Sequence, residues 1–97
     1  MNLTTWLNEQ ARLVRVALMN GDLAAARNAL RFTFEDGDAP DGIRPAMIIR
    51  LAVFPMSRRA LKTARDAFTR RAEHLFADGD DLDAEIRADL YTALFHD

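Results

Sequence analysis

The sequence predicts an all-α protein, a compact bundle of about five helices that forms a single domain over residues 1–97. Three observations predict this class. Apolar residues recur at spacings of three and four positions along most of the chain, as on one face of a helix. Asp, Ser, Gly and Pro, which start or stop helices, separate these periodic stretches. The 97 residues include no cysteine, so stability must come from a packed core rather than from disulfides.

The first two helices are expected over residues 4–19 and 23–34. Thr4 or Thr5 can serve as the N-cap of the first helix, and Asp22 as the N-cap of the second, because their side-chain oxygens can accept hydrogen bonds from free backbone amides. The Asn-Gly pair between them is a typical helix stop.

Residues 35–42 are rich in Gly, Pro and Asp and predict an acidic loop. A third helix is expected over residues 45–54, with Pro45 in its first turn, where the missing amide hydrogen costs nothing. Only Arg50 interrupts the apolar residues of this segment. The segment is therefore expected to be a central helix with apolar side chains buried on every side, and a buried strand is the alternative.

Two further helices are expected over residues 58–77 and 82–95, separated by a second acidic loop at residues 78–81. Such a short link between two helices favours an antiparallel hairpin. The N-caps expected for these helices are Ser57 for the first, and Asp81 or Asp83 for the second.

Charge is distributed unevenly along the chain, although its net value is only −2. Residues 1–54 carry six basic and six acidic groups and are balanced. Residues 55–77 carry six basic and two acidic groups, a net +4, and residues 78–97 carry one basic and seven acidic groups, a net −6. The fourth helix is therefore a candidate for contact with an anionic partner.

The first half of the fourth helix concentrates this positive charge. At about 100° per residue, Arg58, Lys62 and Arg65 fall in one band about 60° wide. Cations at a helix N-terminus oppose the helix dipole and cost up to about 1 kcal/mol, which a bound anion would offset. The predicted partner-binding basic face comprises Ser57, Arg58, Arg59, Lys62 and Arg65. Three aromatic residues predicted to be exposed could anchor the same partner, namely Phe32, Tyr91 and Phe95.

Neutralisation within the fold is the alternative explanation for the basic helix. An antiparallel hairpin would place the acidic start of the last helix beside Arg70 and Arg71. Arg71 projects from the apolar face of its helix, so a salt bridge inside the fold is expected for it. The acidic loop at residues 35–42 could neutralise the rest of the basic face.

Few residues of the chain can perform catalysis, since it contains two histidines, one serine and one tyrosine. An enzyme would need a site around His74, but the neighbouring Glu73 points about 100° away on the helix, so the two do not form a dyad. The acidic loops do not match the spacing of calcium-binding loops. No catalytic residue, metal or cofactor is therefore expected.

A cytoplasmic location is expected, because the N-terminus does not resemble a secretory signal and no apolar stretch reaches the roughly 18–20 residues of a membrane span. The predicted function is non-enzymatic binding of a protein with an acidic surface. An adaptor would fit, as would a stoichiometric inhibitor of the kind that mobile elements encode against cellular complexes. The alternative is a small DNA-binding transcriptional regulator that uses the basic helix at residues 58–74; a pI near 5.6 counts against it.

Overall fold

The computed structural model describes residues 2–37 and 39–96, and it confirms the all-α class with five helices. No strand occurs in these two ranges. The Cα radius of gyration is 12.4 Å, close to the value of about 12.5 Å typical of one folded domain of this length. The elements, in order, are α1 (Leu3–Met19), α2 (Leu23–Arg31), the π-helical turn η1 (Phe32–Asp36), α3 (Pro45–Val53), α4 (Arg58–Leu75) and α5 (Asp81–Phe95).

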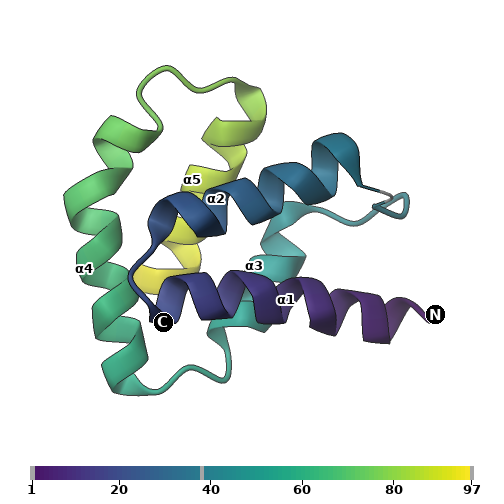
Figure 1. The fold of residues 1–97 in the computed structure, drawn as a ribbon, viewed down its shortest axis with the longest axis horizontal. Helices are drawn as coiled ribbons and strands as arrows, with labels where there is room; N and C mark the ends of the chain where they lie inside the picture. The colour runs from purple at the N-terminus through teal and green to yellow at the C-terminus, as the bar shows by residue number, and fades with distance from the viewer. Residues whose placement is uncertain (1, 38, 97) are drawn as a thin grey trace.

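The helices pack around α1 and α5 (Figure 1). Helix α1 lies against both α2 and α3, and α3 also packs against α5. Helix α4 forms one edge of the molecule, where it contacts α1, α2 and α5. The link between α4 and α5 is short, so the two helices run in opposite directions, as the sequence predicts.

Residues with oxygen-bearing side chains cap four of the helices, but two of the predicted N-caps are wrong. Asn2 caps α1 by accepting a 2.8 Å hydrogen bond from the Thr5 amide, so neither threonine is the cap. Asp80 caps α5 by accepting a 3.0 Å bond from the Asp83 amide, rather than Asp81 or Asp83 acting as the cap. Both helices begin one residue earlier than predicted, which moves the cap toward the N-terminus. The predicted caps Asp22 and Ser57 are confirmed.

Helix α3 confirms the predicted helix at residues 45–54, but it is not buried on every side. Ile48, Ile49 and Ala52 are fully buried, whereas Met47 and Leu51 on the other side are about 40% exposed. A short helix that packs mainly against α1 and α5 still has a third side that faces solvent. Phe54, the residue that follows the end of α3, is 91% exposed.

A single hydrophobic core joins all five helices. Its largest fully buried side chains include Leu18 of α1, Leu30 of α2, Ile48 of α3 and Leu90 of α5, each 1% exposed or less. Helix α4 contributes mostly alanines to the core, which lets its backbone approach its neighbours closely. The large side chains that α4 directs toward α5 are Phe68 and, just after the helix, Phe76.

Candidate functional site

Two aspartates at the start of α5, Asp80 and Asp83, are paired with two arginines of α2. Asp83 is only 1% exposed, and the Arg27 guanidinium donates two hydrogen bonds to its carboxylate, at 3.0 and 2.8 Å. Arg31 donates to Asp80 at 2.7 and 2.9 Å and to Asp83 at 2.9 Å, and it also pairs with Glu35. These charge-assisted bonds lower the pKa of both aspartates below its usual range.

The predicted pairing of this acidic segment with Arg70 and Arg71 is wrong. Both arginines are exposed, and neither has an ion pair with any described residue. The salt bridge expected for Arg71 inside the fold is likewise not found within residues 2–37 and 39–96. Helix α2 crosses the start of α5 and supplies guanidinium groups there, whereas Arg70 and Arg71 lie on the solvent side of α4.

Helix α4 keeps most of its positive charge uncompensated. Within residues 2–37 and 39–96, its one ion pair joins Lys62 to Asp66 at 2.9 Å, inside the same helix, and lowers the pKa of Asp66. Neither acidic loop forms an ion pair with α4 among the described residues. Glu85 of α5 pairs instead with Arg44, just before α3.

The structure places the members of the predicted basic face in different environments. Ser57 is the N-cap and accepts a 3.1 Å hydrogen bond from the Ala60 amide. Arg58 and Arg59 are exposed, and no ion pair is found for either in the part of the chain that the structure describes. Arg65 is half-buried and donates from its Nε to the Leu94 carbonyl, at the end of α5. The binding role of this face stays a prediction.

Two of the three predicted aromatic anchors lie together beside Arg65. The rings of Tyr91 and Phe95 stack with centroids 5.2 Å apart, and both contact Phe68 of α4, at 6.1 and 5.8 Å. Tyr91 is 50% exposed and Phe95 is 38% exposed. Because Arg65 donates to the Leu94 carbonyl, this one member of the basic face lies beside the aromatic cluster. The third predicted anchor, Phe32, lies in η1 and is not part of it.

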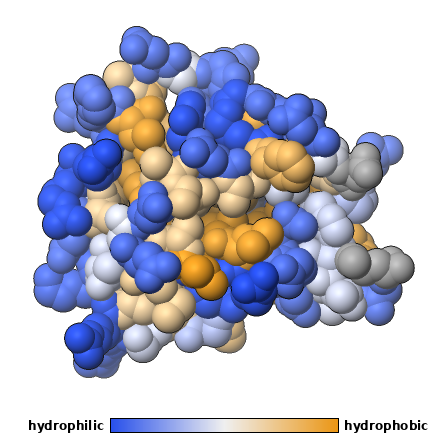
Figure 2. All heavy atoms as spheres, in the orientation of Figure 1, coloured by the Kyte–Doolittle hydropathy of each residue, from blue (hydrophilic) through white to orange (hydrophobic). Residues whose placement is uncertain are grey.

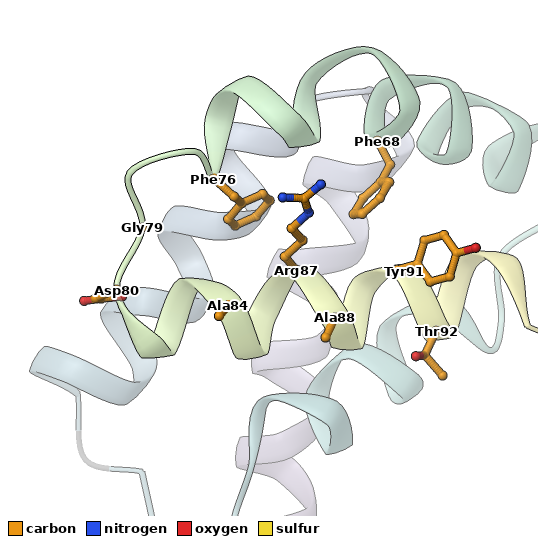
Figure 3. A pocket seen from close by; sticks show the side chains of 9 residues that line it. All are labelled: Phe68, Phe76, Gly79, Asp80, Ala84, Arg87, Ala88, Tyr91 and Thr92. Atoms are coloured by element: carbon orange, nitrogen blue, oxygen red, sulfur yellow. The ribbon is translucent and has the colours of Figure 1, made fainter.

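A groove of about 540 Å³ runs between α4 and α5, next to the aromatic cluster (Figure 3). We call it the α4–α5 groove. Small side chains, Ala84 and Ala88, lie along α5, and aromatic rings border the groove on the α4 side. Its lining residues are Phe68, Phe76, Gly79, Asp80, Ala84, Arg87, Ala88, Tyr91 and Thr92.

Arg87 is the charged group most directly placed in the groove. Its side chain extends from α5 toward α4, between the rings of Phe76 and Phe68 in Figure 3. Among the described residues it has no ion pair. Of the described residues that line the groove, Asp80 alone is acidic, and it is already paired with Arg31. The groove therefore combines an apolar lining with an uncompensated cation.

Apart from Tyr91, the groove residues were missed in the sequence because α5 is apolar on two sides. Its core side carries Ile86, Leu90 and Leu94, all fully buried. Its exposed side carries a second apolar series at helical spacing: Ala84, Ala88, Tyr91 and Phe95. The spacing of four, three and four is visible in the sequence, but alanines are equally common on a solvated face, so it did not stand out.

The exposed apolar surface continues around the end of α5. A second hollow of about 330 Å³ lies between α3 and α5 and includes the highly exposed Phe54 together with Thr92 and His96. Thr92 lines both hollows. On the face shown in Figure 2, apolar atoms also gather near the upper end of α4, bordered by hydrophilic side chains. Patches of this kind often mark binding surfaces.

The two histidines are exposed and lie on different elements, His74 in α4 and His96 just after α5. Within residues 2–37 and 39–96, no three His, Asp or Glu side chains come close enough together to hold a metal ion. No helix in these ranges is both long and apolar enough to cross a membrane.

Comparison of the chain with models of known protein families, with curated proteins and with solved structures finds no match.

Proposed function

We propose that this protein is a non-enzymatic protein–protein interaction domain, an adaptor or stoichiometric inhibitor, that binds an acidic protein partner. The contact surface comprises the α4–α5 groove and the basic face at the start of α4, of which Arg65 reaches the end of α5. A cytoplasmic location is part of the same proposal and agrees with a sequence free of cysteine. The observation that carries the proposal is the exposed apolar side of α5, which no other part of the described chain covers.

The chemistry of the groove suits a helix or an extended peptide. Interface hot spots are enriched in Tyr and Arg, and the groove offers Tyr91 and Arg87 within one turn of each other on α5. Ala84 and Ala88 leave room for apolar side chains of the partner to approach the α5 backbone. An amphipathic helix laid into an apolar groove is a common mode of recognition.

The charges around the groove favour an acidic partner. Arg87 lies inside it. Arg58 and Arg59, farther away at the start of α4, also lie without ion pairs among the described residues, and Arg59 lines a separate hollow beside Met19 of α1. A partner carboxylate that reaches Arg87 would form a charge-assisted hydrogen bond in a partly desolvated setting. Complementary charge at the rim would accelerate association and fix the register of the partner.

The decisive experiment is capture of partners from host lysate on three immobilised proteins, namely the wild type, Ala88→Glu and Asn28→Glu. The first substitution puts bulk and negative charge into the groove, whereas the second adds the same charge on the exposed surface of α2. Proteins retained on each are quantified by mass spectrometry. We expect Ala88→Glu to lose the partner, by about 2 kcal/mol of binding free energy or more, and Asn28→Glu to retain it.

A fourth protein, with Arg58, Arg59 and Lys62 changed to Ser, tests the basic face separately. Weaker capture at physiological salt is expected if the face contributes, and unchanged capture would show that it is not part of the contact surface. If wild type, Ala88→Glu and Asn28→Glu retain the same proteins equally, the groove is not the docking site. Thermal unfolding of each variant establishes that the fold is intact.

The DNA-binding alternative is less well supported, because Lys62 is paired with Asp66 and Arg65 is bonded to the end of α5. It is tested by fluorescence anisotropy with labelled duplex DNA over a range of salt concentrations. Binding that falls steeply with salt, and that the triple substitution abolishes, would support a nucleic-acid partner instead.

A further inference from the structure

A third hollow lies away from the α4–α5 groove, between the N-terminal half of α1 and η1. These two segments lie toward the right of Figure 1. Its volume is about 320 Å³, at the small end of the range for ligand sites. Two aromatic residues, Trp6 and Phe32, border it, together with one carboxylate, Asp36. Gln10, Thr33 and Gly37 complete the lining.

The wide turn of η1 builds this hollow. The Gly37 amide donates to the Phe32 carbonyl at 2.8 Å, five residues back, which closes a π-helical turn. A Cβ at position 37 would lie 2.9 Å from the Thr33 carbonyl oxygen, so the turn requires glycine. Single π-turns are rare and occur frequently at functional sites.

Thr33 holds η1 against α1. It is 4% exposed, and its Oγ1 lies 2.9 Å from Gln10 Oε1 and 3.0 Å from the Ala29 carbonyl oxygen, within hydrogen-bonding distance of both. The hollow is therefore anchored on both sides by a buried polar contact rather than formed by a loose loop. The neighbouring residue, Phe32, is left 65% exposed at its edge.

The residues around the hollow favour a cation. The faces of aromatic rings carry negative charge density, and Trp is the strongest cation–π partner among the side chains. Asp36 has no ion pair among the described residues, whereas Glu35 beside it is occupied by Arg31. A single carboxylate with two rings does not suit a metal ion, which needs several oxygen or nitrogen ligands. It does suit a bulky, weakly hydrated organic cation.

We propose that the Trp6–Phe32–Asp36 hollow binds a quaternary or highly alkylated ammonium group, with the two rings against its methyl groups and Asp36 opposite its charge. Such a group occurs in small molecules of the choline type and in methylated lysine side chains. The site is independent of the α4–α5 groove and of the function proposed for it.

Trp6 is the only tryptophan of the chain, so its fluorescence reports on this site directly. The wild type is titrated with choline, and with 3,3-dimethylbutan-1-ol, a neutral compound of the same shape. We expect a saturable fluorescence change with choline and a response at least about fivefold weaker with the neutral compound. A short peptide that carries trimethyllysine forms a third arm. Tighter binding of the peptide than of choline assigns the site to a protein side chain, and the reverse order assigns it to a small molecule.

Substitutions of the residues that line the hollow test whether choline binds there. Phe32→Leu and Asp36→Asn are each expected to weaken choline binding about five- to tenfold, whereas Phe32→Tyr retains it because the ring is kept. Phe54→Leu, which removes an exposed aromatic residue elsewhere, is the matched control and should bind as the wild type does. Because Phe32 and Asp36 are exposed, these changes should not prevent folding. The proposal is overturned if choline causes no saturable change, if the neutral compound binds equally well, or if Phe32→Leu binds like the wild type.

Discussion

Asp83 combines two properties that rarely occur together, since it is almost fully buried and it carries a charge. Its two carboxylate oxygens are satisfied by Arg27 and Arg31, so the charge is paired in its buried position. Gly79 packs so closely against it that a Cβ there would lie 2.5 Å from the Asp83 Cβ. A buried pair of this kind ties the start of α5 to α2, and its loss would leave unpaired charge behind.

Replacement of Asp83 with asparagine should therefore destabilise the protein markedly. We expect the free energy of unfolding to fall by about 3 kcal/mol, because two guanidinium groups lose a buried charged partner. Urea denaturation followed by circular dichroism measures the change. Asp81→Asn is the matched control, since Asp81 is exposed, and it should alter stability by no more than about 0.5 kcal/mol.

The carboxylates of Asp80 and Asp83 also make the stability of the fold depend on pH. The pKa values of Asp80 and Asp83 are lowered in the folded state by their arginine partners, so the folded state binds protons less readily than the unfolded chain does. Their contribution is complete above the unfolded pKa of about 3.9 and is lost as the pH falls through the lowered folded values. The melting temperature should fall between pH 5 and pH 2, and less steeply for Asp83→Asn than for the wild type.

The charged form of Asp89 should have the opposite effect and lower the stability of the fold. Burial, and repulsion from Glu85, raise the pKa of its carboxyl group, so the charged form is disfavoured by folding. Its contribution to stability is therefore unfavourable above the raised pKa. We expect Asp89→Asn to melt at a slightly higher temperature than the wild type at pH 7, which corresponds to a gain of at most about 0.5 kcal/mol in the free energy of unfolding. At pH 3 the two proteins should melt at the same temperature. An equal or lower melting temperature at pH 7 would contradict this account.

At the scale of helices, two arginines donate hydrogen bonds to carbonyls at the C-terminal ends of other helices. Arg15 of α1 donates at 2.9 Å to the Leu51 and Ala52 carbonyls near the end of α3, and Arg65 of α4 donates to the Leu94 carbonyl of α5. The last carbonyls of a helix have no partner within it, and positive charge is favourable there. Sequence alone could not reveal these contacts, because each donor is about 30 or more residues from its acceptor.

Removal of one such donor should loosen one helix end. Arg65→Ala is expected to cost about 1 kcal/mol and to speed amide hydrogen exchange in the last turn of α5 more than elsewhere. Arg70→Ala, which changes an exposed arginine of the same helix, should leave exchange in α5 unchanged. A uniform acceleration in Arg65→Ala would instead indicate a general loss of stability rather than a role at this helix end.

Across the whole molecule, the sequence predicted more of the local structure than of the tertiary pairing. Periodicity and helix-breaking residues located all five helices, because these signals depend on neighbours a few positions away, although the N-caps of α1 and α5 were assigned to the wrong residues. The partners of Asp80 and Asp83 depend on which helix crosses the start of α5. Because α2 and α4 both carry arginines, the sequence could not show which of the two lies there. The groove was hidden for a related reason, since Ala84 and Ala88 identify an exposed apolar side only once Ile86 and Leu90 are known to face the core.

Charge is also organised at the scale of the molecule. Arginines of α2 pair with Asp80 and Asp83 at the start of α5. The net −2 of the chain therefore coexists with exposed arginines on α4, such as Arg58 and Arg59, that have no ion pair among the described residues. Capture of the proposed partner should therefore weaken as sodium chloride rises from about 0.1 M to 0.5 M, because rim charges are screened. Capture that does not change over this range would point to a purely apolar contact.

Ala88 lies exposed in the α4–α5 groove of a chain without cysteine. A cysteine introduced at that position would be the only thiol of the molecule, and it could be alkylated selectively with a photoactivatable group. The reagent would then sit where the partner is proposed to dock, and irradiation would convert a transient encounter into a covalent adduct. The place of attachment on the captured protein would identify the segment that enters the groove.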